Sequence, residues 1–572
     1  MMKKSKIHTR KSPGLFIIAI GLTVLLLIGG AFALYLLKGA KKITTKDITD
    51  AEKIIGLHFT ATEKRMMLEN LRRTLSSYDA LRAVSLSNSI PPALEFNPVV
   101  PGMKFETEKK LFQLSSSPEV ERPANLEDLA FYPVTSLARL IQSRKVTSLE
   151  LTQMYLSRLK KYGPALECVV TLTEELALKQ ARQADKEIQA GHYRGPLHGI
   201  PWGAKDLLAT KGIKTTWGAM PYKDQVIDEN ATVVRRLEEA GAVLVAKLTM
   251  GALASGDVWF GGKTKNPWNL SQGSSGSSAG SAASTSAGLI AFAIGTETWG
   301  SIVSPATRCG VTGLRPTFGR VSRHGAMALS WSMDKIGPIS RYVEDCALVF
   351  NAIYGPDGLD LTVTDLPFNW DPELPVQDIR VGYLKSAFEK DSKTKKNDDE
   401  TLRTLRSLGV ELIPLEIPDL PVEAISFILW TEAAASFDEL TRSDRDDLLV
   451  RQDQRAWPNT FRSARFISAV EYIQANRIRT LLLQDMAARL KDIDVYVAPS
   501  FGGNNLLLTN LTGHPAVIIP NGFDTEGSPT SISFIGGLFE EAKTLRLAKA
   551  VQDATGFHLK YPSLEEKHPP SK

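Results

Sequence analysis

The 572-residue sequence contains only three cysteines and eight histidines. Cys168, Cys309 and Cys346 stand far apart and form no C-x-x-C pair, which excludes a disulfide framework and a zinc ribbon. No H-E-x-x-H motif occurs, which excludes the metalloproteases built on that motif. With 43% hydrophobic and 23% charged residues, the composition also excludes a disordered chain, a collagen and a coiled coil.

Positive charge is concentrated at one end of the chain. The net charge is +5, and eight basic residues within the first 42 positions supply +8, so the remainder carries 5 − 8 = −3. These residues are Lys3, Lys4, Lys6, Arg10, Lys11, Lys38, Lys41 and Lys42. A slightly acidic body argues against a nucleic-acid-binding protein.

Residues 14–37 contain no charged side chain and are almost wholly apolar. A helix of this length measures roughly 36 Å, against about 30 Å for the hydrocarbon core of a bilayer. The segment therefore predicts a transmembrane signal-anchor, with residues 1–13 as a cytoplasmic basic region and the catalytic part outside the cytoplasm. The alternative is a secreted protein cleaved near Ala33, because Ala31-Phe32-Ala33 fits a signal-peptidase site.

The remaining chain divides into an extension, a large domain and a polar tail at 563–572. Residues 44–125 predict a helical N-terminal extension followed by a proline-rich linker or wrapping arm. Residues 126–562 alternate helix and strand signals, as where the helical pattern of Thr232–Ala240 stops at Gly241 and an apolar run follows. This alternation predicts an α/β domain with a large sheet covered by helices on both faces.

Residues 271–288 form a tract of 8 Ser, 4 Gly and 4 Ala. Such a composition is typical of a flexible linker. The tract runs directly into the apolar segment 289–295, however, and small residues also occur where backbones approach each other closely. Both interpretations are open at this point.

A nucleophile elbow is a first interpretation of this tract. Gly276-Ser277-Ser278-Ala279-Gly280 matches G-x-S-x-G, which would make Ser278 a nucleophile, and Asp334 and His514 follow in the order of an α/β-hydrolase triad. That elbow requires a strand immediately before it, and residues 266–272 do not have a strand pattern. The motif alone is therefore weak support for a hydrolase of this type.

A second interpretation uses several ordered segments. Lys205 within Gly199–Asp206, the pair Ser277-Ser278, and Gly300-Ser301-Ile302 resemble the amidase signature family, which includes the amidase component of tRNA-dependent amidotransferases. The resemblance covers roughly residues 126–560 and is densest at 261–344. It includes the segments Lys265–Asn269, Gly310–Thr317, Met333–Pro338 and Asn510–Pro515. The N-terminal helical part faintly resembles the small helical partner of that component.

The resemblance implies a role for each of these residues. Ser301 would be the nucleophile, Ser277 a bridging serine on a cis peptide bond, and Lys205 the base, with Ser278 bonded to Lys205. The oxyanion hole would consist of the backbone N–H groups of Thr298, Trp299, Gly300 and Ser301. Lysine acts as a base only when neutral, so its pKa must fall from about 10.4 to near 7, which burial can achieve. This chemistry needs no metal and no organic cofactor.

The sequence departs from the family pattern around the nucleophile. The family usually has Asp-x-Gly-Gly-Ser-Ile-Arg there, and this chain has Glu297, Trp299 and Val303 at the first, third and last positions. Losing both the usual Asp and the usual Arg predicts that a local ion pair is absent. The indole of Trp299 predicts a pocket of different shape.

The predicted function is an amidase that hydrolyses the C–N bond of a small-molecule carboxamide through an acyl-enzyme. Its predicted environment is the membrane, reached through the N-terminal helix. Two alternatives stay open: a glutaminase-type component of a transamidation complex, and a non-catalytic tethered binding protein on an amidase scaffold.

Overall fold

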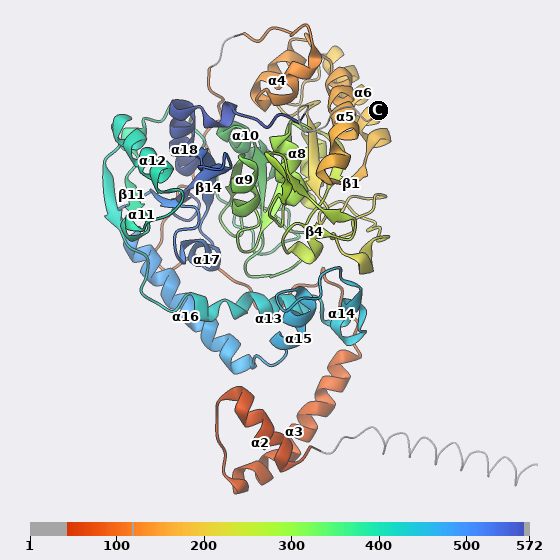
Figure 1. Cartoon of the computed structure of the whole chain (residues 1–572), viewed down its shortest axis with the longest axis vertical. Coiled ribbons are helices and arrows are strands. Elements are labelled where there is room, and N and C mark those ends of the chain that lie inside the picture. Colours follow the sequence, from red (N-terminus) through yellow and green to blue (C-terminus); the bar gives the residue numbers. More distant parts are fainter. Residues whose placement is uncertain (1–42, 117–118, 565–572) are drawn as a thin grey trace, which may run out of the picture. The chain divides into compact units, whose positions relative to one another are not determined.

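The computed structural model describes residues 43–116 and 119–564. Contacts divide the chain into two units, Met1–Leu86 and Ser87–Lys572. Figure 1 shows the helices and strands of both.

The predicted basic region, the anchor at 14–37 and the cleavage site near Ala33 lie outside the described residues. Within 43–116 and 119–564, no helix combines the length and apolar character needed to cross a membrane. The two longest helices, α3 (Ala61–Arg82) and α16 (Ala469–Arg489), carry charged side chains along their length. This finding contradicts the predicted single-pass membrane localisation with an extracytoplasmic domain, and that prediction is corrected accordingly.

The described part of the first unit is a pair of helices, α2 (Thr45–Ile55) and α3. Each begins with a capping box, in which a threonine side chain and an acidic side chain three residues later accept each other's backbone N–H. The threonines are Thr44 and Thr60. Lys64 on α3 pairs with Glu52 on α2 at 2.7 Å. No residue of α3 is buried, so this helix presents exposed side chains along its whole length.

An eleven-stranded mixed sheet is the centre of the second unit. The strands lie in the order β1 (Val169–Leu172), β3 (Val243–Leu248), β2 (Pro201–Lys205), β8 (Phe292–Glu297), β10 (Lys335–Ser340), β9 (Thr312–Arg315), β14 (Ala516–Phe523), β15 (Pro529–Gly536), β13 (Val495–Pro499), β11 (Val381–Leu384) and β12 (Leu412–Leu415). Strand β2 runs parallel to both β3 and β8, whereas β8 runs antiparallel to β10. Two small hairpins, β4 (Val258–Trp259) with β5 (Gly262–Lys263) and β6 (Lys265–Asn266) with β7 (Asn269–Gly273), lie outside it.

Helices cover the central strands in layers (Figure 1). Helix α8 (Ala279–Ser286) packs on α9 (Val303–Cys309), and α10 (Val343–Ile353) packs on α18 (Glu541–Thr555); members of both pairs contact β10, β9 or β14. The remaining helices of the second unit are α4 (Val134–Gln142), α5 (Ser148–Leu166), α6 (Glu174–Gln189), α7 (Thr232–Glu239), α11 (Lys385–Glu389), α12 (Lys395–Ser407), α13 (Phe427–Ser436), α14 (Asp438–Arg442), α15 (Trp457–Ala464), α16 and α17 (Asn505–Leu511). The predicted α/β domain with a large mixed sheet is confirmed.

The Ser/Gly/Ala tract forms a buried helix. All eight residues of α8 are buried, and the preceding Gly276 lies so close to another loop that an added Cβ would stand 1.9 Å from the carbonyl oxygen of Gly256. Small residues are required here because the backbone passes directly against its neighbours. The flexible-linker interpretation is therefore wrong.

Residues 87–116 contain no helix or strand and lie against the second unit at several points. The Phe96 ring packs edge-on against Phe318, and the guanidinium of Arg479 lies 3.5 Å from its centre. Further along, the Asn369 side chain accepts the N–H of Lys110 at 2.9 Å and donates to the carbonyl of Glu108 at 2.8 Å. This segment is therefore tied to the domain at points far apart in its own sequence.

We expect the stacked pair Trp202 and Phe292 on adjacent strands β2 and β8 to stabilise the core strongly. Their rings are 6.1 Å apart, and Phe292 is fully buried. Phe292→Ala is expected to lower the free energy of unfolding by about 3–5 kcal/mol. Phe466→Ala, at a side chain that is 65% exposed, should change it by less than about 0.5 kcal/mol. Urea unfolding followed by fluorescence measures both, and equal losses would contradict the prediction.

Candidate active site

Lys205 is the last residue of β2 and is fully buried between β3 and β8. Its Nζ lies 2.9 Å from Ser277 Oγ, 3.1 Å from Ser278 Oγ and 2.8 Å from Thr296 Oγ1. Burial lowers the pKa of Lys205 to about 7, while the charges of Asp334 and Glu297 act in the opposite direction. A substantial fraction of this lysine is therefore neutral near neutral pH.

Ser277 and Ser278 precede α8 and bring their hydroxyl groups to Lys205. Ser277 follows a cis peptide bond with Gly276, as the resemblance implied. Ser278 Oγ also accepts the N–H of Thr296 and donates to the Thr296 carbonyl, both at 3.1 Å. Ser278 N–H donates to the Ser301 carbonyl at 3.2 Å, so the three predicted serines meet at one point.

Ser301 lies in the turn between β8 and α9 and is 8% exposed. Its hydroxyl has no hydrogen-bond partner among residues 43–116 and 119–564, in contrast to Ser278. Gly300 has a φ of +85°, a conformation that other residues rarely adopt, so the turn requires glycine. For Thr298, Trp299, Gly300 and Ser301, the described residues likewise provide no backbone acceptor for the main-chain N–H groups.

Glu297 fixes the start of α9 directly after this turn. One carboxylate oxygen accepts the N–H groups of Ile302 and Val303 at 2.8 and 2.9 Å. The other oxygen meets Arg315 Nη1 at 2.9 Å and Asn510 Nδ2 at 2.8 Å, entirely inside the protein. Although burial acts against ionisation, Arg315 and these N–H groups lower the pKa of Glu297 to about 2. The predicted absence of a local ion pair is therefore wrong, because Arg315 on β9 provides the partner.

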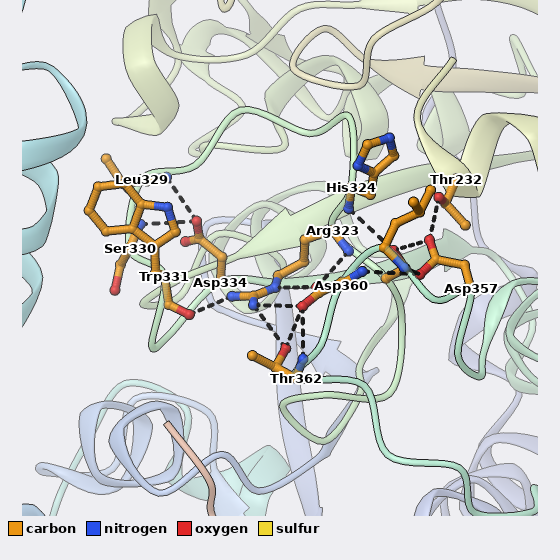
Figure 2. Close-up of polar contacts among 12 residues, drawn as sticks. Thr232, Arg323, His324, Leu329, Ser330, Trp331, Asp334, Asp357, Asp360 and Thr362 are labelled. Carbon is orange, nitrogen blue, oxygen red and sulfur yellow. Dashed lines mark hydrogen bonds and ion pairs between the residues drawn. The ribbon is translucent and has the colours of Figure 1, made fainter. Parts of the chain in front are cut away.

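Asp334 and Trp299 border the same turn. Asp334 accepts the hydroxyl of Thr298 at 2.5 Å and the N–H groups of Leu329 and Ser330 at 2.8 and 3.0 Å (Figure 2). The indole of Trp299 is 36% exposed and lies 6.0 Å from the ring of Trp430 on α13. Asp334 thus holds the backbone of the turn, and Trp299 lies at the surface beside it.

The elbow interpretation of Ser278 does not fit this arrangement. Strand β7 ends at Gly273, so no strand runs directly into Ser278. His514 is buried and bonds through Nδ1 to the hydroxyl of Thr512 at 2.8 Å, and burial lowers its pKa to about 3. Nothing places this histidine on Ser278, whose hydroxyl faces Lys205 and Thr296 instead.

Sequence reasoning did not identify Thr296 or Arg315 as part of the site. Thr296 provides the shortest hydrogen bond to Lys205, and Arg315 neutralises Glu297. A signal existed for each of them, because Thr296 directly precedes Glu297 and Arg315 lies within the segment Gly310–Thr317. Their roles depend on the register of β8, β10 and β9, which the motif alone does not give.

Comparisons with known proteins agree with this fold and site. The family model described as Amidase matches residues 150–508. The amidase component (the one designated A) of glutamyl-tRNA(Gln) amidotransferase from Marinomonas sp. (strain MWYL1) is 33% identical over 479 residues, covering 75% of this chain and 98% of that protein. The protein of the same name from Methylococcus capsulatus is 33% identical over 478 residues, with the same coverage. The solved structure of native peptide amidase from Stenotrophomonas maltophilia is 28% identical, with a TM-score of 0.69, covering 77% of this chain and 100% of that one.

The chain therefore belongs to the amidase family. It is an enzyme that hydrolyses carbon–nitrogen bonds of amides, and its α/β fold is that of the family. This result leaves the alternative of a non-catalytic binding protein without support.

The ion pair of Glu297 generates a prediction on stability and pH. A pKa lowered from an ordinary 4.5 to about 2 stabilises the fold above pH 4.5, and this contribution disappears as pH falls towards 2. The wild type should therefore exceed Glu297→Gln in unfolding free energy near neutral pH, and the gap should narrow by about 3 kcal/mol between pH 6 and pH 2.

Urea unfolding at several pH values measures that gap. Glu541→Gln is the matched control, because Glu541 pairs with Arg320 in an equally buried ion pair outside the turn at Ser301. We expect Glu297→Gln to lower both stability and turnover, and Glu541→Gln to lower stability alone. A gap that stays constant with pH would contradict the lowered pKa.

Proposed function

We propose that this enzyme hydrolyses carboxamides with Ser301 as the nucleophile, Lys205 as the general base and Ser277 as the group that relays the proton between them. The observation that supports this proposal is the buried Nζ of Lys205, placed among hydroxyl groups and 2.9 Å from Ser277 Oγ. The catalytic domain is proposed to span 126–562, preceded by the extension at 44–125.

The reaction follows from these positions. Neutral Lys205 accepts the proton of Ser277 while Ser277 accepts that of Ser301, whose Oγ then attacks the amide carbonyl. The N–H groups of residues 298–301 would stabilise the resulting oxyanion, each worth about 10²–10³ in rate. The proton returns from Lys205 through Ser277 to the leaving amine, the C–N bond breaks, and water hydrolyses the acyl-enzyme by the reverse relay.

Hydrogen bonding at Lys205 supports a base of this kind. A neutral amine has two N–H donors and one lone pair. Thr296 and Ser278 offer acceptors for the two donors, which leaves the lone pair for the hydroxyl of Ser277. By contrast Lys247, the buried lysine on β3, lies 3.2 Å from a carboxylate oxygen of Asp206. Lys205 has no carboxylate this close among the described residues, so less opposes its deprotonation.

A second candidate function is supported by the 33% identity to components of glutamyl-tRNA(Gln) amidotransferases. In that case the chain would release ammonia from glutamine for a transamidation complex. Glutamine carries charged ammonium and carboxylate groups, which the site would have to accommodate. Ammonia release from glutamine, compared with that from uncharged primary amides under the same conditions, separates the two functions.

Labelling with a fluorophosphonate tests the nucleophile. We expect the full chain to be labelled at Ser301, and Ser301→Ala to lose both the label and amide turnover by at least about 10³-fold. Peptide mass mapping identifies the labelled residue. Ser304→Ala is the matched control, because Ser304 begins the same helix and has no assigned role. Labelling that persists in Ser301→Ala would overturn the assignment.

The pKa of Lys205 sets the expected pH dependence. Because the base must be neutral, kcat/KM should rise about tenfold per pH unit below pH 7 and level off above it. Lys205→Arg, which stays protonated, should be inactive throughout this range. Initial rates with an uncharged amide between pH 5 and pH 9 give the profile. A rate that falls as pH rises through 7 would contradict a lysine base.

A further inference from the structure

A cavity of about 180 Å³ opens next to the proposed catalytic residues and reaches Thr296 and Thr298. Much of its wall is apolar, with contributions from Leu207, Ala254, Met327, Leu329, Trp331 and Ile336. For comparison, an engineered apolar cavity of about 150 Å³ binds benzene. The cavity can therefore hold a group the size of a phenyl ring or a short alkyl chain.

The charged side chains around the cavity are engaged with each other. Arg323 pairs with both carboxylate oxygens of Asp360 at 2.9 and 3.2 Å and donates to the Trp331 carbonyl at 2.5 Å (Figure 2). Its remaining contact is the hydroxyl of Thr362 at 2.9 Å. A guanidinium with its donors used in this way does not offer a site for a carboxylate of the substrate.

The other charges lead to the same conclusion. Asp334 already accepts three hydrogen bonds, and His324 lies 3.3 Å from Glu229. Burial lowers the pKa of Lys335 well below its ordinary value, which favours the neutral amine. Glu95 adds a carboxylate at the rim, where it would repel a substrate anion. The cavity thus suits an uncharged, apolar group.

One wall of this cavity comes from outside the residues matched by the amidase family model, 150–508. We call residues 88–96 the strap. At one end, the Asn88 side chain accepts the N–H of Ala328 at 2.8 Å and donates to its carbonyl at 2.9 Å. At the other end, Phe96 packs between Phe318 and Arg479. Between these two anchors, Ser89, Pro91, Pro92, Leu94 and Glu95 line the cavity.

We propose that the strap is a specificity element that completes a binding subsite for an uncharged apolar substituent of the amide substrate, of up to about six carbons. This inference rests on the proposed function, since it places the substituent beside Ser301. The two prolines reduce the flexibility of the strap, and the Asn88 contacts fix its distance from the loop at Ala328. Strap residues are thus positioning and binding residues rather than participants in the chemistry.

Binding to the full chain carrying Ser301→Ala tests the subsite without turnover. Titration calorimetry with acetamide, butanamide and hexanamide should show affinity rising about three- to fourfold per methylene, as expected for apolar burial. Octanamide should gain nothing over hexanamide, and hexanamide with a terminal carboxylate should bind at least about tenfold more weakly. N-alkyl acetamides of the same lengths establish whether the carbonyl side or the nitrogen side enters the cavity.

The Asn88 contacts provide the test of the strap. Adding Asn88→Ala to this protein should weaken hexanamide binding about tenfold and leave acetamide binding unchanged. Asn369→Ala is the matched control, because Asn369 makes the same pair of hydrogen bonds to residues 108 and 110, outside the cavity lining. It should change neither affinity. Melting temperatures establish that both variants are folded.

Three results would overturn the parts of this proposal separately. Affinities that do not depend on chain length in either amide series would overturn the apolar subsite. Equal effects of Asn88→Ala and Asn369→Ala would overturn the role of the strap. Length-dependent binding together with a wild type that neither turns over these amides nor takes the fluorophosphonate label would overturn the catalytic assignment and leave the subsite in place.

Discussion

The removal of one lysine from water is the constraint on which the site depends. Lys205 ends a strand in the interior of an eleven-stranded sheet, and burial lowers its pKa to about 7. Its immediate partners are hydroxyl and carbonyl groups, whereas a carboxylate at the same distance would favour the charged amine. Two carboxylates do act on it from further away, and both are held by other partners: Glu297 by Arg315, and Asp334 by Thr298 and two backbone N–H groups.

That arrangement links the electrostatics of the site to the position of the nucleophile. Glu297 accepts the first N–H groups of α9 and is neutralised by Arg315 from the other side, so the turn that carries Ser301 is fixed between a strand and a helix. A buried carboxylate without Arg315 would cost several kcal/mol. The same contacts therefore stabilise the fold, orient the turn and direct the charge of Glu297 away from Lys205.

The sequence predicted the fold class and assembled the candidate residues, because short motifs such as Gly199–Asp206 and Gly300-Ser301-Ile302 carry local information. It also led to the interpretation that an ion pair was missing at positions 297 and 303. Arg315 is close to Glu297 only through strand register, which depends on long-range pairing of β8, β10 and β9. Thr296 and the strap belong to the same category. The Ser/Gly tract was ambiguous because composition does not distinguish a linker from a closely packed helix.

Specificity and chemistry come from different parts of this chain. Residues proposed for the reaction lie within 150–508, where the match to the family occurs, and they depend on a rigid sheet. The strap lies before that range, has no regular secondary structure, and is positioned by one asparagine and one phenylalanine. Changes in the strap can alter the size of the cavity without moving Lys205 or Ser301. A segment outside the family domain is thus where we expect substrate preference to differ between this enzyme and its relatives.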